Sequence, residues 1–173
     1  LAVPLIEVDA RNVVPAWEAA DKQIYAAHHL RGRYERLLPS YLAELPEPPK
    51  AAGAPPELFT TLDGEAELAF VRAGEYGPPI ALPAGERAAR AALDAFIETR
   101  LDGYAARRGD PSTDAQSGLS PYLHFGQLSV QRAVAEVMAA GDREGLRDDV
   151  AEFIDEAVVW RELADNFCLF QTG

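Results

Sequence analysis

The sequence predicts a mainly α-helical protein, and three observations lead to this fold class. Apolar residues recur at helical spacing in three segments, 15–45, 86–104 and 120–170. The segment 46–85 between the first two is rich in Pro and Gly, which interrupt regular elements. The apolar fraction of 48% over 173 residues is high enough to form a real core.

The first 45 residues predict one strand followed by helix. Val3 to Asp9 reads as a short buried strand that runs into a polar turn. From Pro15 onwards the pattern is helical, with one apolar stripe formed by Tyr34, Leu37, Leu38, Tyr41, Leu42 and Leu45. Because Pro39 lies inside this stripe, we expect the helix to break or kink near Leu38.

Residues 46–85 predict a surface connection, within which only 67–71 has a strand-like pattern. Helical spacing returns at Glu86, with a stripe formed by Leu93, Phe96, Ile97, Leu101 and Tyr104. After a polar loop, Ser120 is a good N-cap and Pro121 suits the first helical position. A further helix follows Ser129, and the last one spans about 146–170.

Charge and cysteine content restrict the function classes. The formal net charge of −12 argues against DNA binding by this chain alone, because binding phosphates requires clustered Lys and Arg. The single cysteine excludes an internal disulfide and fits a reducing, cytoplasmic compartment. No signal peptide, membrane-length apolar run, P-loop or zinc spacing is visible, and both ends of the chain look cut.

Two groups of residues could carry chemistry. The loop from Asp114 to Pro121 places Ser117, Gly118 and Ser120 beside a predicted helix N-terminus, whose unpaired N–H groups suit a phosphate. Glycine would let the backbone approach a ligand closely. Ordinary helix capping explains the same residues, and on physical grounds alone that alternative stays open.

The second group lies on the last helix. Glu156 and Trp160 are four residues apart, so they lie ~40° from each other on one face. A carboxyl beside a flat ring would suit a flipped-out nucleobase, which proteins read by hydrogen bonds and stacking. The alternative is a core tryptophan with Glu156 paired to Arg161 or Arg100.

The same two regions carry a resemblance to a known family. Residues 114–127, DAQSGLSPYLHFGQ, resemble the flavin-binding signature of class II cyclobutane pyrimidine dimer photolyases, and 156–168, EAVVWRELADNFC, resemble the helix of that class that meets the damaged bases. Residues 7–15 and 21–23 resemble the end of the family's N-terminal domain. The chain thus looks like an internal fragment of a photolyase/cryptochrome protein.

This resemblance implies a domain organisation. Residues 1–45 would be the C-terminal end of an α/β, Rossmann-like domain, and 46–85 the interdomain connection. Residues 86–173 would be the first helices of an all-helical FAD-binding domain, truncated before its second half.

It also implies roles for single residues. The cofactor-binding residues would be Tyr104, Gln116, Ser117, Gly118, Leu119, Ser120 and Arg161. Glu156 would hydrogen-bond the dimer and stabilise its radical anion, and Trp160 would form a wall of the dimer pocket. Asn166 belongs to the motif without an assigned role.

The implied activity is a light-driven carbon–carbon lyase reaction. Reduced FAD would pass an electron to a flipped-out dimer in ultraviolet-damaged DNA, the ring would split, and the electron would return. We expect a monomeric bacterial protein, with any antenna chromophore bound by the missing N-terminal part, and we expect this fragment alone to be inactive. Two alternatives remain: a cryptochrome-like flavin photoreceptor, and a non-enzymatic helical interaction domain.

Overall fold

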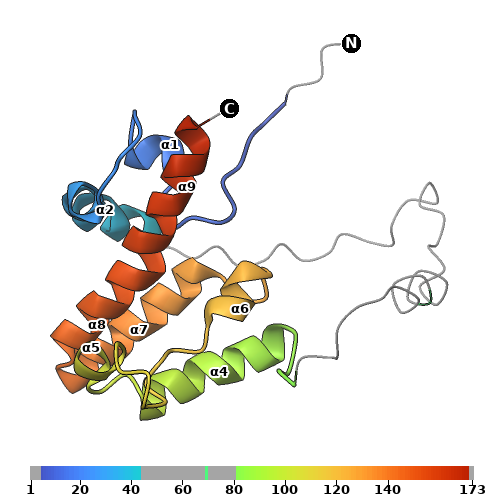
Figure 1. Ribbon diagram of the computed structural model, residues 1–173, viewed down its shortest axis with the longest axis vertical. Coiled ribbons are helices and arrows are strands. Elements are labelled where there is room, and N and C mark those ends of the chain that lie inside the picture. The colour runs from blue at the N-terminus through green and yellow to red at the C-terminus, as the bar shows by residue number, and fades with distance from the viewer. Residues whose placement is uncertain (1–4, 44–68, 70–80, 172–173) are drawn as a thin grey trace. The chain divides into compact units, whose positions relative to one another are not determined.

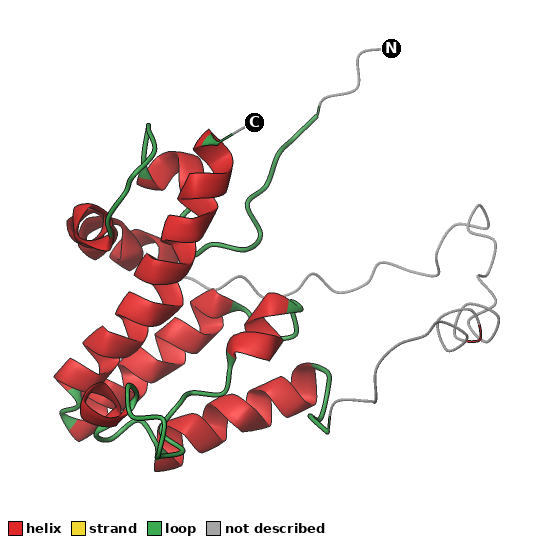
Figure 2. Ribbon diagram, viewed as in Figure 1, coloured by secondary structure: helices red, strands yellow, loops and turns green. Residues whose placement is uncertain are grey.

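The computed structural model describes residues 5–43, 69 and 81–171, and every regular element in this part of the chain is helical (Figure 2). The predicted mainly helical class is confirmed. The helices are α1 (Ala16–Ala19), α2 (Ala27–Leu42), α4 (Glu86–Thr99), α5 (Tyr104–Arg107), α6 (Ser120–His124), α7 (Val130–Glu144), α8 (Arg147–Ile154), the π-helical η1 (Asp155–Trp160) and α9 (Arg161–Phe170). None of the described helices is long and apolar enough to span a bilayer.

The chain divides into two compact units, 1–45 with 84–173, and 46–83. The predicted connection 46–85 and its strand at 67–71 lie almost entirely outside the described residues. Within the first unit, α2 packs against η1, and α1 packs against α9. The assignment of residues 1–45 to an α/β domain stays a prediction.

The strand expected at the start of the chain is absent from its described residues, 5–9. Leu5 and Ile6 are 97% and 78% exposed, because no second strand is present among the described residues to pair with them. Asp9 instead organises the turn that follows: its carboxylate accepts the backbone N–H groups of Arg11, Asn12 and Ala16 at 3.0–3.1 Å.

No break occurs near Leu38, and the alternative expectation of a kink there stays a prediction. α2 continues through Pro39 to Leu42 and buries Leu30, Tyr34 and Leu38 on one side. Pro39 is exposed and lies in the last turn of α2, so the helix ends within three residues of the hydrogen bond that the proline ring removes.

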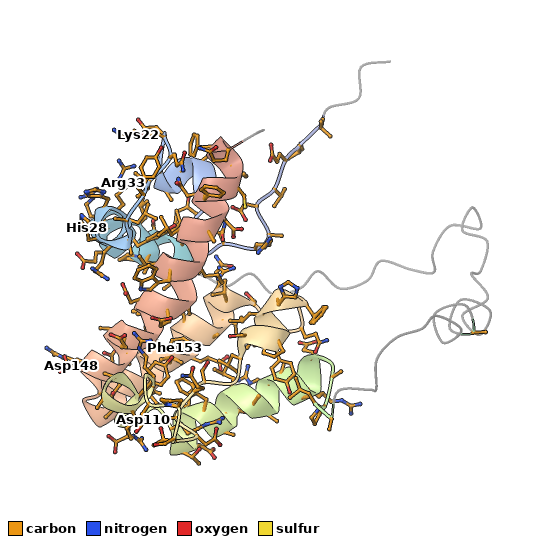
Figure 3. All side chains as sticks on the ribbon, in the orientation of Figure 1. Lys22, His28, Arg33, Asp110, Asp148 and Phe153 are labelled. Atoms are coloured by element: carbon orange, nitrogen blue, oxygen red, sulfur yellow. The ribbon has the colours of Figure 1, made fainter. Side chains whose placement is uncertain are left out.

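The apolar stripe that begins in α4 crosses two elements. α4 ends at Thr99, and Gly103 adopts a positive φ of 74° before α5 begins at Tyr104. Leu101 and Tyr104 are buried as the stripe predicts, but they belong to the turn and to α5. Tyr104 packs edge-on against Phe96, with ring centroids 5.2 Å apart, and both contact Phe153 of α8, which Figure 3 labels.

The predicted last helix is present as α8, η1 and α9, which form one rod (Figure 1). Phe153, Ala157, Val158 and Val159 are buried in the core. The other side is not buried, because Trp160 and Phe167 are 50% and 54% exposed. The predicted last helix is therefore buried on one side and exposed at Trp160 and Phe167 on the other.

Candidate functional site

Glu156 is held by an arginine that the sequence did not single out as its partner. Arg108 Nη2 lies 3.0 Å from Glu156 Oε1, and the same guanidinium also contacts the carboxylate of Glu152. The predicted alternatives, Arg161 and Arg100, do not make this contact among the described ion pairs. Glu156 remains accessible, with 37% of its side chain exposed.

Arg108 connects three of the predicted site residues. It follows Tyr104 by one helical turn, and its backbone carbonyl accepts a hydrogen bond from Gln116 Nε2. Burial raises the pKa of Tyr104, and the charges of Arg108, Glu156 and Glu152 act on the same phenol. Tyr104, Gln116 and Glu156 therefore converge on Arg108.

The 116–120 turn is anchored by buried Leu119 and by the buried Ala115 that precedes it, while Gln116 and Ser120 are exposed and Ser117 is partly buried. Ala115 and Leu119 are 2% and 1% exposed, and Ser117 Oγ accepts the Leu119 N–H at 3.4 Å. Gly118 has a φ of 71°, and a Cβ there would meet no atom within 4 Å, so the space above it is open. Glycine is favoured here by its backbone conformation.

Ser120 does not cap its helix. It is the first residue of α6, Leu119 occupies the cap position, and no side chain caps the N-terminus. Leu119 already has helical backbone angles, so it takes the N-cap position expected for Ser120, and the helix begins one residue earlier than predicted. The Ser120 side chain is exposed, so its hydroxyl is accessible from solvent.

Trp160 faces a different neighbour from Glu156. Its indole Nε1 donates to Asp155 Oδ2 at 3.0 Å, and Asp155 is bound by Arg31 of α2. The indole borders a depression of about 350 Å³ that is lined by Gln23, Ile24, Tyr25, Leu163, Ala164 and Phe167. Glu156 does not line it, because its carboxylate is directed to α5, so the expected shared cavity is not formed there.

Arg161 contacts its own helix. Its Nε donates to the Ala157 carbonyl at 2.9 Å, and its Nη2 donates to Glu162 Oε1 at 3.1 Å. No described hydrogen bond or ion pair connects it to the 116–120 turn. Its predicted place beside a flavin stays a prediction.

Two buried polar residues of α9 had no role assigned from the sequence. Glu162 and Asn166 are 1% and 2% exposed and accept the backbone N–H groups of Val13 and Ile24, each at 2.7 Å. Asn166 Nδ2 also donates to the Lys22 carbonyl at 3.2 Å. Burial raises the pKa of Glu162 to about 7. Their spacing of four residues, in register with buried Val158, is the signal that could have identified them.

The described residues contain no cluster of three or more His, Cys, Asp or Glu side chains able to hold a metal. They do fit part of a nucleotide. The exposed Ser120 hydroxyl and an open glycine turn suit a phosphate, although the charged cluster at Arg108 has one arginine and two carboxylates.

No family model matches the chain. Three curated proteins named deoxyribodipyrimidine photo-lyase are similar to it: 39% identity with that of Potorous tridactylus, 42% with that of Arabidopsis thaliana and 41% with that of Oryza sativa subsp. japonica. The alignments cover 97%, 95% and 98% of this chain and 31%, 35% and 34% of those proteins.

A shorter similarity, 31% identity over 44% of this chain, links it to cryptochrome-1 of Sinapis alba. The chain thus spans about a third of the length of the curated photo-lyases it matches. Over nearly all of its own length it is similar to about a third of a deoxyribodipyrimidine photo-lyase.

Proposed function

We propose that the intact protein carrying this chain is a class II photolyase that repairs cyclobutane pyrimidine dimers in DNA by light-driven electron transfer from reduced FAD. The proposal rests on the similarity to photo-lyases over 95–98% of the chain. The observation that supports it in the structure is the convergence of Tyr104, Gln116 and Glu156 on Arg108.

The 116–120 turn is the proposed phosphate contact of the cofactor. Ser117, Gly118 and Ser120 would receive the phosphates, with Gln116 and buried Leu119 fixing the turn and Tyr104 one helical turn before Arg108. When bound, reduced FAD would supply the light-driven electron. Arg161 is proposed to approach the flavin or DNA only in the intact protein.

Glu156 is the proposed hydrogen-bond donor to the dimer, aimed at charge that develops during ring opening. In the structure its carboxylate accepts from Arg108, so donation requires that it leave this partner and carry a proton. Trp160 is the proposed stacking wall, since half of its side chain is exposed.

The proposed partner is ultraviolet-damaged DNA, and the rest of the protein would have to supply the basic surface. The charge of −12 cannot provide phosphate neutralisation. Binding of FAD and DNA is therefore proposed for the intact protein, which we further propose to be a monomeric cytoplasmic protein with any antenna chromophore bound outside this chain. The 173-residue chain alone is proposed to be inactive.

The experiment is photorepair by the purified intact protein. We expect a bound flavin and loss of dimers from irradiated DNA in blue light but not in darkness, and neither property for the 173-residue chain alone. Bound flavin without repair would favour a cryptochrome-like photoreceptor, for which the similarity to cryptochrome-1 is the supporting observation. Absence of flavin and of any effect of Glu156→Ala would favour a helical interaction domain.

A further inference from the structure

Trp160 is held in place by two charged residues that the resemblance does not assign. Its Nε1 donates to Asp155 Oδ2 at 3.0 Å. Asp155 is gripped in turn by Arg31 of α2 through two bonds of 2.8 Å, from Nε to Oδ1 and from Nη2 to Oδ2. Such paired guanidinium–carboxylate bonds fix geometry as well as adding energy.

The π-helical segment creates this arrangement. In an α-helix, residues five apart are roughly 140° apart around the axis, so Asp155 and Trp160 would diverge. η1 spans Asp155 to Trp160, and the i→i+5 pattern of a π-helix brings the two ends of the segment into line. Inserted π turns of this kind are frequently found at functional sites.

The exposed fractions of Trp160 and Asp155 show which side chain these hydrogen bonds restrain. Trp160 is 50% exposed, whereas the Asp155 side chain is only 16% exposed. A half-exposed indole with no polar partner would sample several rotamers. Here its N–H edge is fixed toward α2, and a face is left beside the depression lined by Tyr25, Leu163 and Phe167.

We propose that Arg31 and Asp155 are positioning residues that orient the Trp160 indole for stacking on a flipped-out pyrimidine. The inference rests on the proposed function and adds two residues to it. Neither residue touches the base. Arg31 acts on Asp155, and Asp155 acts on the indole N–H.

The test compares Arg31→Ala and Asp155→Ala with a matched control in the intact protein. Arg90→Ala removes a similar surface pair, because Arg90 Nη1 lies 2.8 Å from Glu136 and the Arg90 side chain is 45% exposed, against 47% for Arg31. We expect both positioning variants to bind a dimer-containing oligonucleotide about 5-fold more weakly, as loss of one hydrogen bond would give. Undamaged DNA binding should not change, and KM should rise while kcat stays constant. Arg90→Ala should behave as the unmodified protein.

A double-mutant cycle separates positioning from a general structural effect. Trp160→Phe keeps a ring but has no N–H, so adding Asp155→Ala to it should cost no further affinity. An equal loss in both backgrounds, or the same loss in Arg90→Ala, would overturn the proposal.

An activity-independent measurement distinguishes failure of this inference from failure of the proposed function. In protein with isotope-labelled tryptophan, the Trp160 indole N–H, assigned by its loss in Trp160→Phe, should exchange with solvent faster in Asp155→Ala than in the unmodified protein. Unchanged exchange would sink the inference even if repair is normal. If the indole N–H exchanges slowly in the unmodified protein but that protein repairs no dimers, the purpose assigned to Arg31 and Asp155 is refuted, and so is the proposed function.

Discussion

Two carboxylates six residues apart on the same rod have opposite surroundings. Glu156 is 37% exposed and pairs with Arg108 of the α5 C-terminal end. Glu162 is 1% exposed, accepts the Val13 N–H at 2.7 Å and lies beside Tyr34 of α2. The buried carboxylate is committed to holding other segments, whereas the accessible one can exchange its partner. Stability and function should therefore separate between them.

The largest effect is expected for Glu162→Ala. It leaves the buried Val13 N–H without its acceptor and opens a cavity beside Tyr34, so we expect a loss of about 3 kcal/mol in the free energy of unfolding. Urea denaturation measures the loss, and faster hydrogen exchange at Val13 would locate it. Glu156→Ala is the matched control, and equal losses for the two would break the comparison.

Glu162 should also make stability depend on pH. Its pKa rises from an ordinary 4.5 to about 7, so the folded state holds a proton that the unfolded state releases. The stabilisation that this proton gives the folded state is complete below about pH 4.5 and is lost as pH rises to about 7. The free energy of unfolding should fall by about 3 kcal/mol at most over this range.

The measurement is urea denaturation at several pH values for the unmodified protein and Glu162→Gln. The glutamine variant should lack this component, so the difference between the two curves should change with pH in that window. Parallel curves would show that burial does not perturb this carboxyl.

Asn166→Ala should have a smaller effect, about 2 kcal/mol, because the Ile24 N–H and the Lys22 carbonyl lose a buried partner. Hydrogen exchange at Ile24 measures it. Gln171→Ala is the control, since Gln171 reaches Gln23 of the same loop through an exposed bond. If the control accelerates exchange at Ile24 as much, burial of Asn166 is not what holds the loop.

Periodicity predicted the helices because core packing and sequence spacing agree. Leu93, Phe96 and Phe153 are buried as their stripes require. The expectations that failed came from other patterns: a break at Pro39, through which α2 continues, and a strand at residues 5–9, which have no partner strand among the described residues. Helical periodicity cannot locate such effects.

The site was predictable only in part for a related reason. The pattern identified Glu156 and Trp160 on one helix, but it assumed α-helical geometry through Asp155–Trp160, which is π-helical. It also could not specify partners distant in sequence: Arg108 is 48 residues before Glu156, and Arg31 is 124 residues before Asp155. Glu162 and Asn166 stood in the motif, but their function became clear only from the segment 13–24 packed against them.

The smallest stability effect and the most informative functional one are expected at Glu156. Because its ion pair with Arg108 is partly exposed, Glu156→Gln and Glu156→Ala should each change the free energy of unfolding by less than about 1 kcal/mol. If Glu156 donates a hydrogen bond to the dimer, Ala should lower the repair yield per absorbed photon roughly 10²-fold. Gln should lower it less, because its amide can still donate.

Photorepair by the intact protein, measured at saturating DNA, distinguishes these cases. A loss in Gln as large as that in Ala would show that the carboxylate acts as an acceptor or a charge, and not as a donor. Unchanged yields in both variants would show that Glu156 takes no part in the reaction and serves only as the ion-pair partner of Arg108. Either result would redefine what the accessible carboxylate does, without altering the structural role of its buried counterpart.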